Sequence, residues 1–130
     1  MTGYLVDTSI FVAAEQDRAV QPPPQGEARI SVATLTELRV GVLRAESPLR
    51  ALREATFARA QRFIPLPYDE VVAERLANLL AEARARKRRA SAMDAIIAAT
   101  ALAHDLAVWT HDGDFDVLAE LEPRLRVHPG

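Results

Sequence analysis

Short apolar runs alternate along this chain with segments whose apolar residues recur at helical spacing, and this alternation strongly constrains the fold. The runs predict strands at Tyr4–Val6, Ile30–Val32, Leu106–Trp109 and Leu125–Val127. Helical spacing and helix-start residues predict helices over 10–15, 34–45, 47–63, 69–86, 95–104 and 115–121. Strands that alternate with helices favour an α/β fold, with a parallel sheet covered on both faces.

Length and composition limit the organisation. The 130 residues, 49% of them hydrophobic, suffice for one core, so we expect a single domain over residues 1–130. We see no apolar stretch of membrane-spanning length and no N-terminal signal pattern, and therefore predict a cytoplasmic protein without a membrane partner. The net charge of -2 argues against nucleic-acid binding through global positive charge, so any such binding has to be local.

Four acidic residues lie close to the ends of the predicted strands or at a helix start. Asp7 follows the first apolar run, Glu37 comes shortly after the second, Asp94 opens an apolar helix, and Asp112 lies just beyond Val108-Trp109. Ligand sites of open α/β sheets lie outside the carboxyl ends of the strands. We therefore expect these acids to converge at one edge of the sheet.

Each acid taken alone also has a purely structural explanation. Thr34–Glu37 and Ser91–Asp94 both match the capping box, in which the fourth residue accepts a hydrogen bond at a helix start. Asp112-Gly113 is an ordinary turn pair, Asp114 could cap the helix that follows, and Asp7 could favour a helix dipole. For one acid in isolation the structural explanation is the stronger, whereas the joint pattern favours a site.

A convergent cluster of acids needs cations. Neighbouring carboxylates raise each other's pKa unless a positive charge neutralises them. The chain has no cysteine, so a metal would be held by oxygen or imidazole, and the three histidines show no ligand spacing. Mg²⁺ or Mn²⁺ suits carboxylate oxygens, and one ion or a pair could stabilise cleavage of a phosphodiester.

Four motifs in order resemble the PIN domain, and more narrowly the VapC ribonuclease toxins of type II toxin-antitoxin pairs. They are Val6-Asp7-Thr8-Ser9, Thr36-Glu37-Leu38 followed by Gly41, Asp94-Ala95-Ile96-Ile97-Ala98, and Thr110-His111-Asp112-Gly113-Asp114-Phe115. The resemblance covers nearly the whole chain. It implies a three-layer α/β/α sandwich with a central, mainly parallel sheet of four to five strands. It also implies a Mg²⁺- or Mn²⁺-dependent endoribonuclease that forms a homodimer and is silenced by a small VapB-like antitoxin.

The same resemblance assigns roles to particular residues. Asp7, Glu37, Asp94 and Asp112 match the acidic quartet of the family, and Asp114 is an alternative for the fourth place. Thr8, Ser9 and Thr110 resemble the hydroxyl residues that line such pockets. We expect Asp7 and Asp94 to bind metal directly, and Glu37 and Asp112 to hold its waters or a second ion. Attack by water is the predicted route, and attack by the ribose 2′-hydroxyl is the alternative.

Basic residues are concentrated in one run of the chain, which we call the basic patch. It comprises Arg84, Arg86, Lys87, Arg88 and Arg89. Contact with RNA and the solvated end of a helix explain this run about equally well.

Three other classes of protein compete with the nuclease. A phosphatase with an aspartyl nucleophile would carry a second acid where this chain has Ser9, and Lys87 is the only lysine. A receiver-like signalling domain would need adjacent early acids and a late lysine, and both are missing. A degenerate PIN module that only binds a partner is disfavoured by the retained acids.

Overall fold

The computed structural model describes residues 3–130 as strands and helices that alternate along the chain. The strands are β1 (Tyr4–Val6), β2 (Ala28–Ser31), β3 (Ile64–Leu66), β4 (Ala107–Thr110) and β5 (Val127–Pro129). The helices are α1 (Thr8–Glu15), α2 (Val32–Arg44), α3 (Leu49–Ala60), α4 (Glu70–Ala85), α5 (Ala92–Ala103) and α6 (Asp114–Leu121).

The five strands form one parallel sheet in the order β3-β2-β1-β4-β5. From β1 the chain moves outward through β2 to β3, and it later returns to the other side of β1 as β4. The strand order therefore reverses between β1 and β4, and their carboxyl ends open the crevice in which such folds bind ligands.

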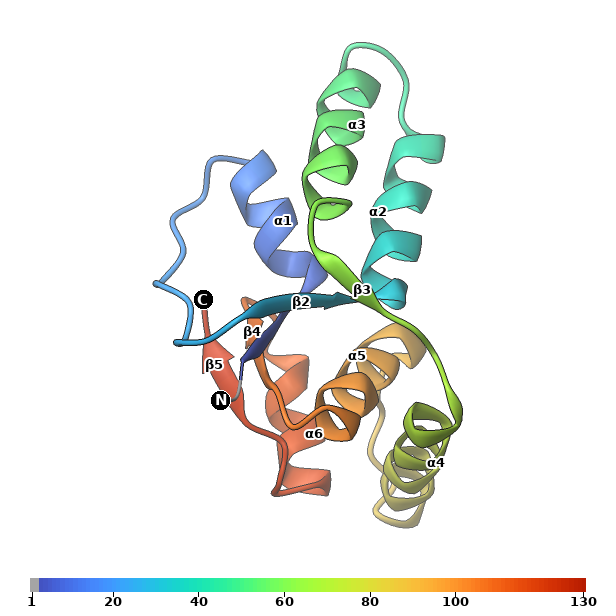
Figure 1. The fold of residues 1–130 in the computed structure, drawn as a ribbon. Coiled ribbons are helices and arrows are strands. Elements are labelled where there is room, and N and C mark those ends of the chain that lie inside the picture. The colour runs from blue at the N-terminus through green and yellow to red at the C-terminus, as the bar shows by residue number, and fades with distance from the viewer. Residues whose placement is uncertain (1–2) are drawn as a thin grey trace.

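Helices cover both faces of the sheet (Figure 1), with α1, α2 and α3 on one side and α4, α5 and α6 on the other. Side chains alternate between the two faces. Leu5 and Val108 are neighbours in register and belong to the core beneath α4, α5 and α6. Val6 and Ile30 belong to the second core, with α1, α2 and α3. This arrangement confirms the predicted three-layer α/β/α sandwich.

The alanine-rich helix α5 is the central helix of the larger core. Its buried residues include Ala95, Ala98, Ala99 and Ala101, all without exposed surface. Small side chains let α5 approach the sheet closely, which brings its first turn to the crevice between β1 and β4.

One strand, β3, was not predicted, and β5 lies further along the chain than predicted. Directly after the helix predicted to end at 63, Ile64–Leu66 forms the edge strand β3, where a residue without a backbone N–H such as Pro65 is tolerated. The last strand was predicted at 125–127 and lies at Val127–Pro129. Leu125 instead is buried in the core with α6. The Pro65 signal was ambiguous because proline ends helices and also occupies edge strands.

Four helices, α1, α2, α5 and α6, begin one to three residues earlier than predicted. Asp7 caps α1, and its side chain accepts a hydrogen bond from the Ser9 backbone N–H. Ser31 caps α2, so Val32 is helical and not part of the strand. The capping box predicted at Thr34–Glu37 is therefore wrong, because both residues lie inside the helix. None of the helices in residues 3–130 has the length and apolar character to cross a lipid bilayer.

Candidate metal centre

Asp7 lies at the carboxyl end of β1 and is 2% exposed. Its backbone N–H donates to the Trp109 carbonyl at 3.0 Å, which continues the pairing of β1 with β4. Its Oδ2 accepts hydrogen bonds from Ser9 Oγ at 2.6 Å, from Ser9 N at 3.3 Å and from Thr110 Oγ1 at 2.8 Å. Burial raises the pKa of this carboxyl group, and the Ser9 and Thr110 bonds partly oppose the rise.

The same two hydroxyl groups hold the loop that follows β4. Ser9 Oγ accepts the His111 N–H at 2.9 Å, and Thr110 Oγ1 accepts the Asp112 N–H at 2.8 Å. The loop carrying Asp112 is thus tied by hydrogen bonds to the residues that fix Asp7. Ser9 and Thr110, predicted to line the pocket, lie in contact with its most buried acid.

Glu37 is held by the third predicted hydroxyl residue, Thr8. Thr8 Oγ1 donates to Glu37 Oε1 at 2.7 Å and lies 3.2 Å from Thr34 Oγ1. Because Ser31 caps α2, the Glu37 side chain is not needed at the helix start, and its carboxylate accepts the Thr8 hydroxyl instead. Burial raises the pKa of Glu37, the Thr8 bond opposes it, and the charges of Asp7 and Asp112 add to the rise.

Sequence reasoning did not identify Thr34 as part of this site. It is fully buried, and it precedes Glu37 by three residues, so both lie on the same face of α2. That spacing was the available signal, but Thr34 was interpreted as a helix cap.

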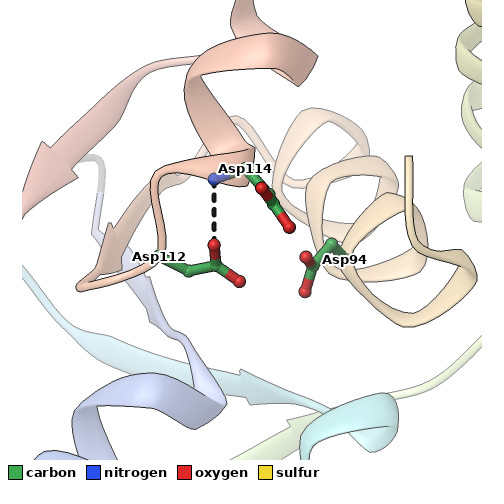
Figure 2. Close-up of side chains that lie close together, drawn as sticks. All are labelled: Asp94, Asp112 and Asp114. Carbon is green, nitrogen blue, oxygen red and sulfur yellow. Dashed lines mark hydrogen bonds between the residues drawn. The ribbon is translucent and has the colours of Figure 1, made fainter. Parts of the chain in front are cut away.

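Asp94, Asp112 and Asp114 bring oxygen atoms within 4.8 Å of one another. Figure 2 shows that Asp94 points from the first turn of α5 toward the loop with the other two. Ser91 caps this helix by accepting the Asp94 N–H at 3.2 Å, so the predicted serine cap is confirmed, and the Asp94 carboxylate projects into the cluster. Asp114 N donates to Asp112 Oδ1 at 2.9 Å. Asp114 begins α6 and does not cap it, since Gly113 occupies the cap position.

The four predicted acids influence each other electrostatically. The pKa of Asp94 is raised to about 7, first by burial and then by the charges of Asp112, Asp7 and Glu37. In ordinary surroundings an aspartate ionises near pH 4. Without a metal ion, the acids of this site are therefore not all ionised at neutral pH.

These residues fit a divalent cation. All the candidate ligands are carboxylate oxygens, which suit Mg²⁺ or Mn²⁺. Positive charge at the cluster would favour the ionised forms that burial and mutual repulsion now disfavour. The hydroxyl groups of Thr8, Ser9 and Thr110 fix two of the acids in place, as expected of the partners that orient metal ligands.

The basic patch does not join this cluster directly. It spans the end of α4 and the connection to α5, whose first turn carries Asp94. Two of its members are held in ion pairs: Arg86 with Glu82 at 2.7 Å and Arg88 with Glu120 at 2.7 Å. All five side chains are exposed.

Fold and site together define a parallel α/β protein with a cluster of carboxylates, able to hold a cation, at the switch point of its sheet. The model of the PIN domain matches residues 4–121. Ribonuclease VapC4 of Mycobacterium tuberculosis is 44% identical over 120 residues, which cover 91% of this chain and 92% of that protein. The chain therefore belongs to the PIN-domain family, as its motifs indicated.

Further relatives agree with this assignment. Ribonuclease VapC5 of M. tuberculosis is 38% identical over 117 residues, covering 88% of this chain and 86% of that protein. In the crystal structure of VapBC-5 from M. tuberculosis, described as a member of the VapBC family of toxin-antitoxin systems, one chain superposes with a TM-score of 0.80 and 35% identity. That match covers 98% of this chain and 97% of the other. The DNA-bound VapBC of Salmonella typhimurium shares the fold, with a TM-score of 0.77, 21% identity and 98% coverage of both chains.

Proposed function

We propose that this protein is a Mg²⁺- or Mn²⁺-dependent endoribonuclease and the toxin of a VapBC-type toxin-antitoxin pair. The observation that carries the proposal is the cluster of Asp94, Asp112 and Asp114 oxygen atoms, beside which burial and the charges of Asp112, Asp7 and Glu37 raise the pKa of Asp94. Relatives named ribonucleases support the reaction type. We take residues 1–130 as one PIN domain that acts in the cytoplasm.

Each acid has a proposed task. Asp7 and Asp94 would bind the ion directly, because Asp7 is buried directly after β1, Asp94 lies in the first turn of α5, and the charge of Asp7 raises the pKa of Asp94. Glu37 and Asp112 hold its waters or a second ion, and Asp114 can supplement Asp112. When bound, such an ion offsets charge on the scissile phosphate and acidifies water for attack.

The protein's own groups prepare this site. Thr110 and Ser9 hold one oxygen of Asp7, which fixes the carboxylate plane. Thr8 fixes Glu37 in the same way from the first turn of α1. The ligands are thus positioned before substrate arrives, and little reorganisation is required during the reaction.

The partners follow from the relatives. Several solved neighbours are described as VapBC, including VapBC-5 of M. tuberculosis, whose description names the VapBC family of toxin-antitoxin systems. We extend that association to this chain and propose a small VapB-like antitoxin and a homodimer. RNA is the proposed substrate, because relatives of this length and similarity are named ribonucleases.

The test is cleavage of a mixed set of structured RNAs with Mg²⁺, with Mn²⁺ and with a chelator. Cleavage should require metal and leave 5′-phosphate ends if water attacks. Asp7→Asn should abolish cleavage while circular dichroism stays unchanged. The matched control is Asp116→Asn, an exposed acid of α6 outside the cluster, which should stay active.

Products with 2′,3′-cyclic phosphate would contradict water attack, and an active Asp7→Asn variant would contradict the assigned role of Asp7. Metal binding without any cleavage would favour a receiver-like or degenerate PIN module.

A further inference from the structure

A groove leads away from the acidic cluster along α2. Two adjoining cavities form it, and both are lined by Glu37, Gly41 and Arg53. The inner cavity also includes Thr8, the hydroxyl residue that holds Glu37. The outer one continues to Arg44 at the end of α2. The groove therefore starts at the proposed metal centre. Its charged lining consists of the arginines Arg44 and Arg53 and the glutamates Glu15, Glu37 and Glu46.

Arg53 is held from one side by the backbone of α2. Its Nη1 donates to the Gly41 carbonyl at 2.9 Å. That carbonyl lies in the last turn of the helix, where the Ala45 N–H donates to Val42 instead of Gly41. Arg53 thus satisfies a carbonyl that the helix leaves open, and this bond fixes the guanidinium group at the groove.

Most of the donors of Arg53 remain available. A guanidinium group has five N–H donors. The nearest carboxylate, Glu15, lies 4.0 Å from Nε, at the outer limit of an ion pair. No further hydrogen bond of the Arg53 side chain is formed within residues 3–130, and the side chain is 35% exposed. A fixed, charged and incompletely paired guanidinium is well suited to bind a phosphate with two parallel hydrogen bonds.

The position of Arg53 suits a phosphate next to the one that reacts. Gly41 follows Glu37 by four residues, one turn of helix, which is a rise of about 6 Å. The anions that a nucleic-acid strand would bring to this distance are its neighbouring phosphates. We propose that Arg53 binds the RNA phosphate adjacent to the scissile one, and so positions the strand over the acidic cluster. This inference rests on the proposed ribonuclease function.

The test measures coupling between Arg53 and one phosphate. A short RNA that spans the cleavage site mapped for the wild-type protein is made with a neutral methylphosphonate at each neighbouring linkage in turn. For wild type, one neutral linkage should lower kcat/KM by about 10- to 100-fold, the loss of a charge-assisted hydrogen bond. Arg53→Gln should show a similar loss on unmodified RNA, mainly through KM, and no further loss with that neutral linkage. Arg53→Lys should be intermediate.

The control and the contrary outcomes separate this inference from a structural role and from the proposed function. Arg50 lies on the same helix, is paired with Glu54 and does not line the groove, so Arg50→Gln should behave as wild type. If Arg53→Gln and the neutral linkage lower kcat/KM independently, so that their effects multiply, Arg53 does not bind that phosphate. If Arg53→Gln weakens only capture of an antitoxin peptide, the groove serves a protein partner and the inference is overturned.

If the wild-type protein cleaves no RNA, the ribonuclease proposal fails, but the Arg53 inference can still be tested. The same RNAs then carry a fluorescent label, and fluorescence anisotropy measures how tightly each one binds to wild type and to Arg53→Gln. Coupling between Arg53→Gln and one neutral linkage would still support the phosphate contact, whereas additive effects or no RNA binding would overturn it.

Discussion

Thr110 donates a 2.8 Å hydrogen bond to Asp7, a residue 103 positions earlier in the chain. The pairing of β1 with β4 makes this contact, because Val6 lies beside Trp109 in register and the next residues along the two chains are Asp7 and Thr110. The hydroxyl group also accepts the Asp112 N–H. One side chain therefore sets the position of two acids of the candidate site.

Replacing Thr110 by valine should lower both stability and activity. The variant removes a donor to a buried carboxylate and an acceptor for the Asp112 N–H, at a cost of about 1 to 3 kcal/mol. We expect a lower Tm and RNA cleavage reduced by about 10- to 100-fold, as for residues that orient metal ligands. Thr110→Ser keeps the hydroxyl group and should stay close to wild type. Full activity of Thr110→Val would show that the contact has no functional role.

The stability of metal-free protein should fall as pH rises from about 5 to 8. The pKa of Asp94 is about 7 in the folded state, above its value in the unfolded chain. The folded state therefore binds more protons in this window, and the free energy of unfolding decreases with rising pH, by about 1 to 2 kcal/mol. Urea unfolding in chelator at several pH values measures the slope. Asp94→Asn should flatten it, and an equally steep slope in that variant would assign the effect to other groups.

Addition of Mg²⁺ should reverse this loss at the upper end of the window. A cation that binds only the folded state stabilises it by mass action, with about 2.7 kcal/mol gained at 100 times the dissociation constant. The rise in Tm with Mg²⁺ should be larger at pH 8 than at pH 5, since the acids are more fully ionised there. Thermal unfolding at both pH values, with and without Mg²⁺, gives the comparison. An equal rise for Asp94→Asn would place the ion elsewhere.

Asp112 and Asp114 should differ in importance. Asp112 is partly buried and acts on the pKa of both Asp94 and Glu37, whereas Asp114 is exposed. We expect Asp112→Asn to reduce cleavage on the order of 100-fold and Asp114→Asn by less than about 10-fold. Steady-state cleavage of one defined RNA checks this order. The reverse order would make Asp114 the fourth acid of the quartet.

The basic patch should contribute to RNA binding through Lys87 and Arg89. Arg86 and Arg88 are already paired with Glu82 and Glu120, so their charge is partly compensated. The double variant Lys87→Gln/Arg89→Gln should weaken binding of single-stranded RNA and reduce the slope of log K against log salt by up to about 1.4. Affinity titrations at several salt concentrations provide the slope. Replacing Arg124 and Arg126, which are paired with Glu122 and Asp105, should leave it unchanged. An unaltered slope in the first variant would identify the patch as a solvated helix end.

Local sequence patterns were sufficient for most elements of the fold. Apolar runs predicted β1 and β4 within about a residue, and the alternation of strands with helices predicted a parallel sheet between two helical layers. Helix starts were less reliable. Thr34 was taken as a cap, because a serine or threonine three residues before an acid matches the capping box wherever it occurs. Ser31 caps the helix instead, because β2 ends there and the backbone turns into α2.

The sequence by itself determined which acids are present and near which strand ends they stand. It also indicated, through Thr8, Ser9 and Thr110, the hydroxyl groups that would accompany them. Only the tertiary structure decided which hydroxyl holds which acid. That choice depends on strand order, since β1 lies between β2 and β4 and brings Asp7 beside both Thr110 and the start of α2. It also placed Arg53, which has no local motif, in the groove beside Glu37. Contacts between residues far apart in the chain follow from the packing of whole elements, which no local pattern specifies.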